Sequence, residues 1–241
     1  MLHFVDHLLV LLVTVVFPVV GYFGYRDKLK RFRAGEDLDR PAMYMSTVTV
    51  QWCMCGVWVL WWLFMQRDWS AIGLGVTVNE WAWIAVALVL GATGLLIAQI
   101  VQLKNTPDDR IAPLYQSVHV AQPLLPRSDR DFRAFCWLGL TAGIVEEVLW
   151  RGVLIWYLNQ FVSFEWAMAL SIVVFTLGHS YQGASQLVGV GLIACLLTLV
   201  YWLTGSLFLA MLLHVAIDIF QGKYAFDLEG RHVRLAHKEG V

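Results

Sequence analysis

Seven apolar stretches separated by polar segments divide the chain of 241 residues. The stretches are continuous, and a helix needs roughly 20 mostly apolar residues to cross a membrane. The last three are joined by very short links, which predicts tight antiparallel hairpins. The pattern therefore predicts an all-α, polytopic transmembrane helix bundle of seven or eight helices. The seven stretches cover about residues 7–25, 43–65, 81–103, 134–158, 164–181, 187–203 and 206–222.

The polar connections suggest four regions. Residues 1–110 hold about three amino-terminal spans, and residues 111–133 form a cytoplasmic or interfacial connection. Residues 134–222 form a helical core, and residues 223–241 are expected to be a cytoplasmic tail. Within the connection, residues 111–126 contain three prolines and are only modestly apolar, which is typical of an interfacial or re-entrant piece. This piece leaves the helix count between seven and eight.

The composition supports a membrane protein. Hydrophobic residues make up 59% of the chain and charged residues 15%, whereas soluble domains carry about 25% charged residues. The net charge of −1 provides no basic field for a nucleic-acid partner, so membrane lipid is the expected surrounding. The four cysteines all fall within apolar stretches and lack the spacing of a zinc knuckle, so we interpret them as packing residues.

Lysine and arginine are distributed unevenly among the connections. Of the 17, six lie in residues 26–40, five in residues 104–133 and four in residues 223–238. Seven spans place these three regions on one side, so the positive-inside rule predicts an outer amino terminus and a cytoplasmic carboxy terminus. Arg67 lies in a loop on the opposite side. Asp6, near the outer amino terminus, is expected to be solvated.

Ionisable residues interrupt the apolar stretches in the last third of the chain. Each costs about 2.5–3.5 kcal/mol at mid-membrane on insertion scales, so such groups are expected to face one another or a water-filled cavity. No comparable group interrupts the second and third stretches. The residues are Glu146, Glu147 and Arg151 in the fourth stretch, His179 in the fifth, and His214 and Asp218 in the seventh.

Helical spacing divides these residues into pairs. Glu147 and Arg151 are four apart and share a helix face, so they can form an ion pair. Glu146 is rotated about 100° from its neighbour and remains the freer carboxylate. His214 and Asp218 are also four apart, so the carboxylate can orient the imidazole or stand beside it in a site.

The chemistry open to these groups is hydrolysis by an activated water. A carboxylate can act as a general base, and histidines can bind a metal, donate to an oxyanion or transfer protons. The HExxH pattern of helical zinc proteases is absent. Proton relay and ion transport use similar groups, and packing alone would explain each pair taken singly.

Three short motifs resemble those of the CPBP family, which comprises type II CAAX prenyl endopeptidases, bacteriocin-processing enzymes and related intramembrane proteases, also called the Abi family. "EEVLWRG" from residue 146 is similar to its EExxxR motif and "FTLGH" from residue 175 to its FxxxH motif. "HVAID" from residue 214 is similar to its HxxxN/D motif. The resemblance covers about residues 126–222, with the motifs in the family's order.

The resemblance implies a role for each motif residue. Glu146 would activate water, while Glu147 and Arg151 would maintain the geometry and charge of the site. His179 would bind or orient the water, and His214 with the residue four later would stabilise the oxyanion.

This chain has Asp218 where many members have asparagine, and an ionised aspartate cannot donate a hydrogen bond to an oxyanion. Asp218 would then be protonated, support His214 or bind a metal. The residue set allows both a metal-free glutamate mechanism and a zinc ion held by Glu146, His179 and His214.

The sequence thus predicts an intramembrane endopeptidase, a CAAX-type membrane peptidase that depends on a glutamate or a metal. It would hydrolyse a protein or peptide, prenylated or not, at the cytoplasmic side of the membrane. The alternatives are a non-catalytic immunity or scaffold protein of the same family and an ion-coupled carrier. A carrier would show inverted repeats or helices broken in mid-membrane, and neither is evident.

Overall fold

The computed structural model describes residues 2–75, 79–117 and 122–238, and within these ranges the chain is helical with no strand. Several long rods are joined by short turns, and two of the rods contain π-helical turns. The elements are α1 (Phe4–Leu11), the π-helix η1 (Leu12–Val16), α2 (Phe17–Arg33), α3 (Arg40–Phe64), η2 (Trp69–Ile72), α4 (Ala82–Lys104), η3 (Asp108–Arg110), α5 (Ile111–Ser117), η4 (Gln122–Leu124), α6 (Asp129–Glu146), the π-helix η5 (Glu147–Leu154), α7 (Ile155–Leu158), α8 (Phe164–Gly178), η6 (Ser180–Gln182), α9 (Ala184–Thr204) and α10 (Phe208–Lys238).

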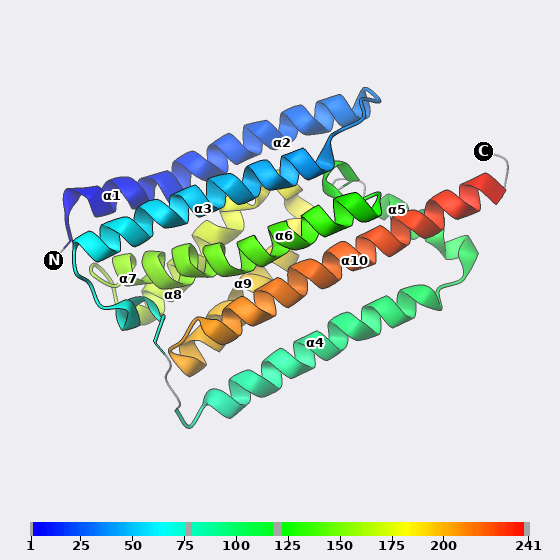
Figure 1. Cartoon of the computed structure of the whole chain (residues 1–241). Coiled ribbons are helices and arrows are strands. Elements are labelled where there is room, and N and C mark those ends of the chain that lie inside the picture. Colours follow the sequence, from blue (N-terminus) through cyan, green and yellow to red (C-terminus); the bar gives the residue numbers. More distant parts are fainter. Residues whose placement is uncertain (1, 76–78, 118–121, 239–241) are drawn as a thin grey trace.

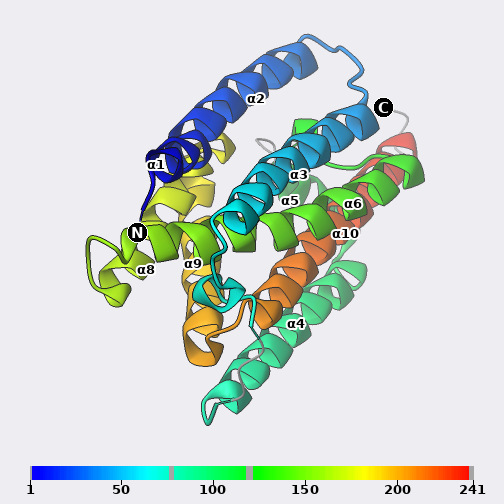
Figure 2. The ribbon, with the colours of Figure 1, turned by 60° about the vertical axis from the view of Figure 1, so that its left-hand side comes forward.

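The rods lie side by side, and the two ends of the chain lie at opposite ends of the bundle (Figure 1). Helix α6 lies in the middle, with α3 packed on one side and α10 on the other. Helix α4 packs against α10 on its outer side, and α8 and α9 form a second layer behind α6, as the rotated view also shows (Figure 2). The central α6 therefore contacts helices from both halves of the chain.

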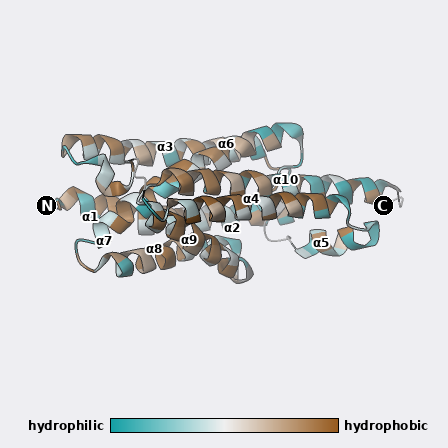
Figure 3. Cartoon of the chain, turned by 90° about the horizontal axis from the view of Figure 1, so that it is seen from below, coloured by the Kyte–Doolittle hydropathy of each residue, from teal (hydrophilic) through white to brown (hydrophobic). Residues whose placement is uncertain are grey.

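The all-α membrane bundle is confirmed. Each of the seven predicted stretches corresponds to one helical rod, and five helices in the described ranges are long and apolar enough to cross a membrane by length and composition. Helix α8 is a shorter apolar helix of 15 residues, and the rod from α6 to α7 carries the three charges of the fourth stretch. Hydrophilic positions gather near the end that holds the carboxy terminus (Figure 3). The chain is an integral, multi-pass membrane protein.

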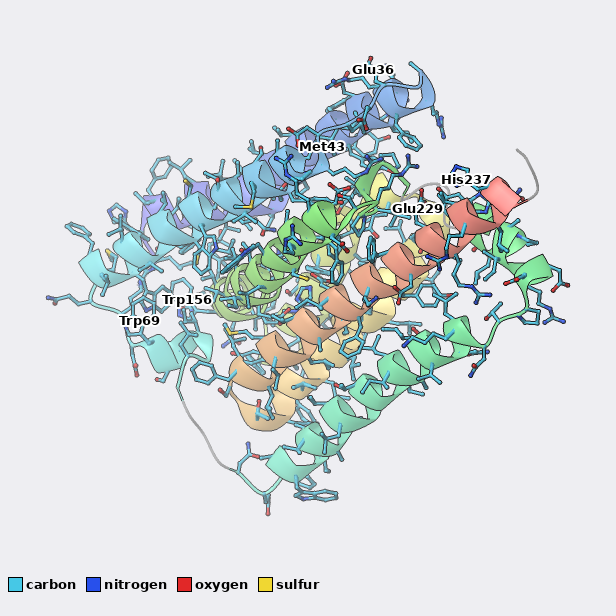
Figure 4. The ribbon with its side chains drawn as sticks, turned by 45° about the vertical axis from the view of Figure 1, so that its right-hand side comes forward. Glu36, Met43, Trp69, Trp156, Glu229 and His237 are labelled. Carbon is cyan, nitrogen blue, oxygen red and sulfur yellow. The ribbon has the colours of Figure 1, made fainter. Side chains whose placement is uncertain are left out.

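Helix α10 is longer than its apolar stretch predicts, because the helix continues past residue 222 to Lys238. Leu228 on this extension is fully buried against Leu103 and Ile111. Arg231 donates from Nη1 to the Leu103 carbonyl in the last turn of α4, and from Nη2 to the Thr106 carbonyl just beyond it at 2.8 Å. Glu229 and His237 mark the extension in Figure 4. Most of the predicted tail is therefore packed helix, and its last three residues lie outside the described ranges.

The connection predicted as an interfacial piece contains the short helix α5, and its residues 118–121 lie outside the described ranges. Helix α5 packs against the extension of α10, where the rings of Tyr115 and His232 stack with centroids 4.2 Å apart. Apolar and aromatic side chains thus hold α5 against the extension of α10.

The expectation that Asp6 is solvated is wrong. Asp6 is fully buried and accepts hydrogen bonds from Arg67 Nη1 at 2.7 Å and Nη2 at 2.6 Å. Trp61 Nε1 donates to the same carboxylate at 2.8 Å, and the guanidinium lies 4.6 Å from the ring centroid of Trp156. Trp156 is labelled in Figure 4. The isolated arginine of this loop therefore joins the start of α1 to the end of α3.

Candidate active site

Two glycines bring α6 against α10. A Cβ on Gly143 would lie 2.6 Å from the backbone nitrogen of Val215, and one on Gly139 would lie 3.1 Å from the Cβ of Asp218. Small residues four apart allow membrane helices to approach closely. Because Val215 follows His214, this approach places Glu147 of the first motif beside the histidine of the third.

We expect Gly143→Ala to lower stability by about 1–3 kcal/mol, as overpacking of a tight contact does. The added methyl group meets backbone, which cannot move aside as a side chain can. Gly94→Ala in α4 is a matched control, since a Cβ there meets nothing within 4 Å. Thermal unfolding in detergent measures both variants, and equal unfolding midpoints for the two would contradict the tight approach.

The first motif forms a π-helix from its second residue, Glu147, onward. Residues Glu147–Leu154 form η5 between α6 and α7, so the charged residues lie on a widened turn. A π-helix leaves carbonyls without their usual α-helical partners, and such turns occur frequently at functional sites. Ser171 on α8 donates from Oγ to the Trp150 carbonyl at 2.8 Å. Helix α8 thus supplies a partner for the widened turn.

Glu147, Arg151 and His214 form a buried polar network. Arg151 Nη1 donates to Glu147 Oε1 at 2.9 Å, and His214 Nδ1 donates to the same oxygen at 2.7 Å. Glu147 and Arg151 are fully buried, and His214 is 5% exposed. The predicted pairing of Glu147 with Arg151 is present, and it extends to the third motif. This network links η5 to α10.

Glu146 faces a different set of partners. Its Oε2 lies 3.9 Å from His179 Nε2, and its Oε1 accepts a hydrogen bond from Gln51 Nε2 on α3 at 2.8 Å. The side chains of Glu146 and His179 are 16% and 18% exposed. Glu146 therefore remains accessible while its neighbour Glu147 is fully buried.

The ring of His179 has a defined tautomer when neutral. Its Nδ1 lies 2.9 Å from the Phe175 carbonyl, which can only accept, so Nδ1 carries the proton. The lone pair of the neutral ring is then on Nε2, the nitrogen that faces Glu146. His179 caps α8 at its carboxy-terminal end, so the turn of the helix fixes the direction of the ring.

The ring of Phe175 packs against both histidines and the buried arginine. Its ring centroid lies 4.4 Å from that of His179 and 6.5 Å from that of His214. The guanidinium carbon of Arg151 lies 4.2 Å from the same ring, within the range of a cation–π interaction. The aromatic position of the second motif thus forms an apolar wall of the site.

Asp218 is the most exposed member of the cluster. Its side chain is 28% exposed, and its Oδ2 lies 3.9 Å from His214 Nε2. At this distance the two groups interact through their charges rather than through a direct hydrogen bond. His214 therefore lies between two carboxylates, with Glu147 at Nδ1 and Asp218 near Nε2.

The structure brings the six predicted residues together, but one further contact was not predicted from the sequence. Gln51 lies in the middle of the apolar helix α3 and is 5% exposed. A polar amide in the middle of a membrane span needs a partner, and that signal could have drawn attention to it. The sequence could not show which helix supplies the partner.

A zinc ion held by Glu146, His179 and His214 would need these side chains to converge. Among the residues that the structure describes, no three His, Cys, Asp or Glu side chains are grouped as ligands of one ion would be. Both histidines use Nδ1 for other partners, Phe175 and Glu147, which leaves Nε2 as the nitrogen open to a ligand on each ring. A zinc ion at these residues stays a prediction, and the chemistry below is derived from the side chains alone.

The fold and the site together define an integral membrane protein with a polar cluster enclosed between its helices. Residues 130–220 match the family model described as type II CAAX prenyl endopeptidase Rce1-like. This segment contains all three motifs, and the match confirms the resemblance to CAAX-type intramembrane proteases that was drawn from them. No curated protein and no solved structure matched the chain.

Proposed function

We propose that this chain is an intramembrane endopeptidase that hydrolyses a peptide bond with a water activated by Glu146. The observation that carries the proposal is the convergence of Glu146 Oε2 and His179 Nε2, 3.9 Å apart and both partly exposed. The two groups come from separate helices and face each other across a space that a water can bridge. Hydrolysis uses such an arrangement because a water bound to both groups can lose a proton to the carboxylate.

In the proposed reaction, the water oxygen attacks the carbonyl carbon of the substrate while Glu146 takes one of its protons. The carbonyl oxygen becomes an oxyanion. When the intermediate breaks down, the carbon–nitrogen bond is cleaved and protonated Glu146 returns the proton to the leaving amine. Water is thereby added across the peptide bond, and no covalent enzyme intermediate is required.

His214 is the proposed oxyanion donor. Its Nδ1 donates to Glu147, so its Nε2 donates only when the ring carries both protons. The cluster contains three carboxylates and one guanidinium, and a protonated imidazole offsets part of that negative charge. Glu147 and Arg151 have the role of holding this ring in position. Their complete burial supports a positioning role rather than contact with substrate.

Asp218 has the proposed role of stabilising the protonated form of His214. We expect Asp218→Ala to lower kcat by about tenfold or more, the usual scale for one charged partner. Asp218→Asn should keep more activity than Asp218→Ala, because an amide can itself donate to the oxyanion. Initial rates of the two variants check this order, and equal rates would contradict a role for the side chain at this position.

The proposed substrate is a membrane-associated protein or peptide that approaches from the cytoplasmic side. Because the family is described as CAAX prenyl endopeptidases, the first substrate to test is a prenylated CAAX peptide, together with the same peptide without the prenyl group. Purified wild-type protein in liposomes is mixed with a panel of such peptides, with and without a chelator, and mass spectrometry identifies the cleaved bond.

The proposal is supported if wild type cleaves any peptide of the panel and Glu146→Gln does not. A loss of cleavage in the presence of the chelator would show that the reaction depends on a metal. Equal product from wild type and Glu146→Gln, in the panel and in cells, would contradict the catalytic role. The cluster would then serve packing, as in a scaffold or immunity protein. The π-helical turn at the charged residues favours the enzyme, since such turns occur frequently at functional sites.

A further inference from the structure

We propose that Gln51 on α3 is a positioning residue for Glu146, an inference that rests on the proposed function. The Gln51 side chain donates from Nε2 to Glu146 Oε1 at 2.8 Å. Gln51 is 5% exposed, so this donor is buried. The contact joins residues 95 positions apart in the chain.

The chemistry of the two groups fixes the direction of this bond. An ionised carboxylate has no proton to donate, so only the nitrogen end of the amide can face it. With Oε1 held by Gln51, Oε2 is the oxygen that faces His179 Nε2. Gln51 therefore selects which oxygen of Glu146 takes the proton from water, and it limits rotation of the carboxylate.

Gln51 also extends the site beyond the matched family segment. Helix α3 precedes residues 130–220, yet it packs along α6. A second side-chain hydrogen bond joins the same two helices, since Trp52 Nε1 donates to Thr141 Oγ1 at 3.1 Å. The position of α3 thus bears directly on Glu146, and the amino-terminal helices become part of the site.

The test compares Gln51→Met with Trp52→Phe. Methionine has nearly the length of glutamine and no donor, whereas Trp52→Phe removes the other hydrogen bond between α3 and α6 without touching Glu146. The full-length variants are measured in liposomes with the panel peptide that wild type cleaves fastest. We expect Gln51→Met to lower kcat about tenfold or more with little change in KM, as the loss of a hydrogen bond to a charged group does. Trp52→Phe should stay within about twofold of wild type, as surface changes usually do.

A spectroscopic measurement separates the contact from the activity. The infrared carboxylate band that disappears in Glu146→Gln belongs to Glu146, and it should shift in Gln51→Met because its hydrogen bond is lost. The band should not shift in Trp52→Phe.

An unmoved band, or a kcat for Gln51→Met equal to that of Trp52→Phe, would overturn the inference. If Glu146→Gln is inactive while Gln51→Met matches wild type, the proposed function stands and the positioning role fails. If Glu146→Gln cleaves as wild type does, the proposed function itself fails. Thermal unfolding midpoints close to that of wild type show that each variant is folded.

Discussion

Glu146→Gln is expected to lower kcat by about 10²–10⁴-fold, the contribution of a positioned general base. Glutamine keeps the size of the side chain, and its Oε1 can still accept the hydrogen bond from Gln51. What it loses is the ability to take a proton from water. Because Glu146 is partly exposed and takes no part in the buried ion pair, the thermal unfolding midpoint should remain that of wild type.

The matched control for this prediction is Glu165→Gln. Glu165 lies in the first turn of α8 and is exposed, so the same chemical change there should leave kcat unaltered. Initial rates and unfolding midpoints of both variants are measured in the same liposome preparation. A Glu146→Gln variant that retains the rate of Glu165→Gln would show that another group activates the water, or that the cluster is not catalytic.

The helical bundle could be predicted from the sequence because each rod is signalled by its own apolar stretch. The end of α10 could not. Residues 223–238 contain four basic residues, a composition typical of a solvent-exposed segment. In the structure, contacts of Leu228 and Arg231 with α4, α5 and the residues between them hold this part of the helix in place. Those partners are more than 100 residues away in the chain. The burial of Asp6 escaped prediction for the same reason, since Arg67 comes from a distant loop.

Within the site, the local pairing of Glu147 with Arg151 could be predicted from helical spacing, and the structure contains it. The bond from His214 to Glu147 could not, because it depends on how closely Gly143 allows α10 to approach. The π-helical turn and the hydrogen bond from Gln51 to Glu146 could likewise not be predicted from the local sequence. Both depend on neighbouring helices rather than on the motif itself. The catalytic roles of the six residues stay predictions until the variants are measured.

Arg151→Met is expected to destabilise the protein by about 3–5 kcal/mol, as breaking one partner of a buried ion pair does. Glu147 is fully buried, and it would lose the donation from Arg151 at 2.9 Å. His214 would still donate to the carboxylate, which argues for the lower end of that range. Unfolding free energy in mixed micelles measures the effect.

The double variant Glu147→Gln with Arg151→Met identifies the cause of this loss. If the cost arises from an unpaired buried charge, removing that charge should recover much of the stability, since replacing both partners of a buried pair is often neutral. Arg31→Met is the control, because Arg31 and Glu36 form a half-exposed pair that should contribute little. A double variant no more stable than Arg151→Met alone would assign the loss to the packing of the long side chain against Phe175. Glu147 and Arg151 would then act by filling space, and the proposal that their charges hold His214 in position would be contradicted.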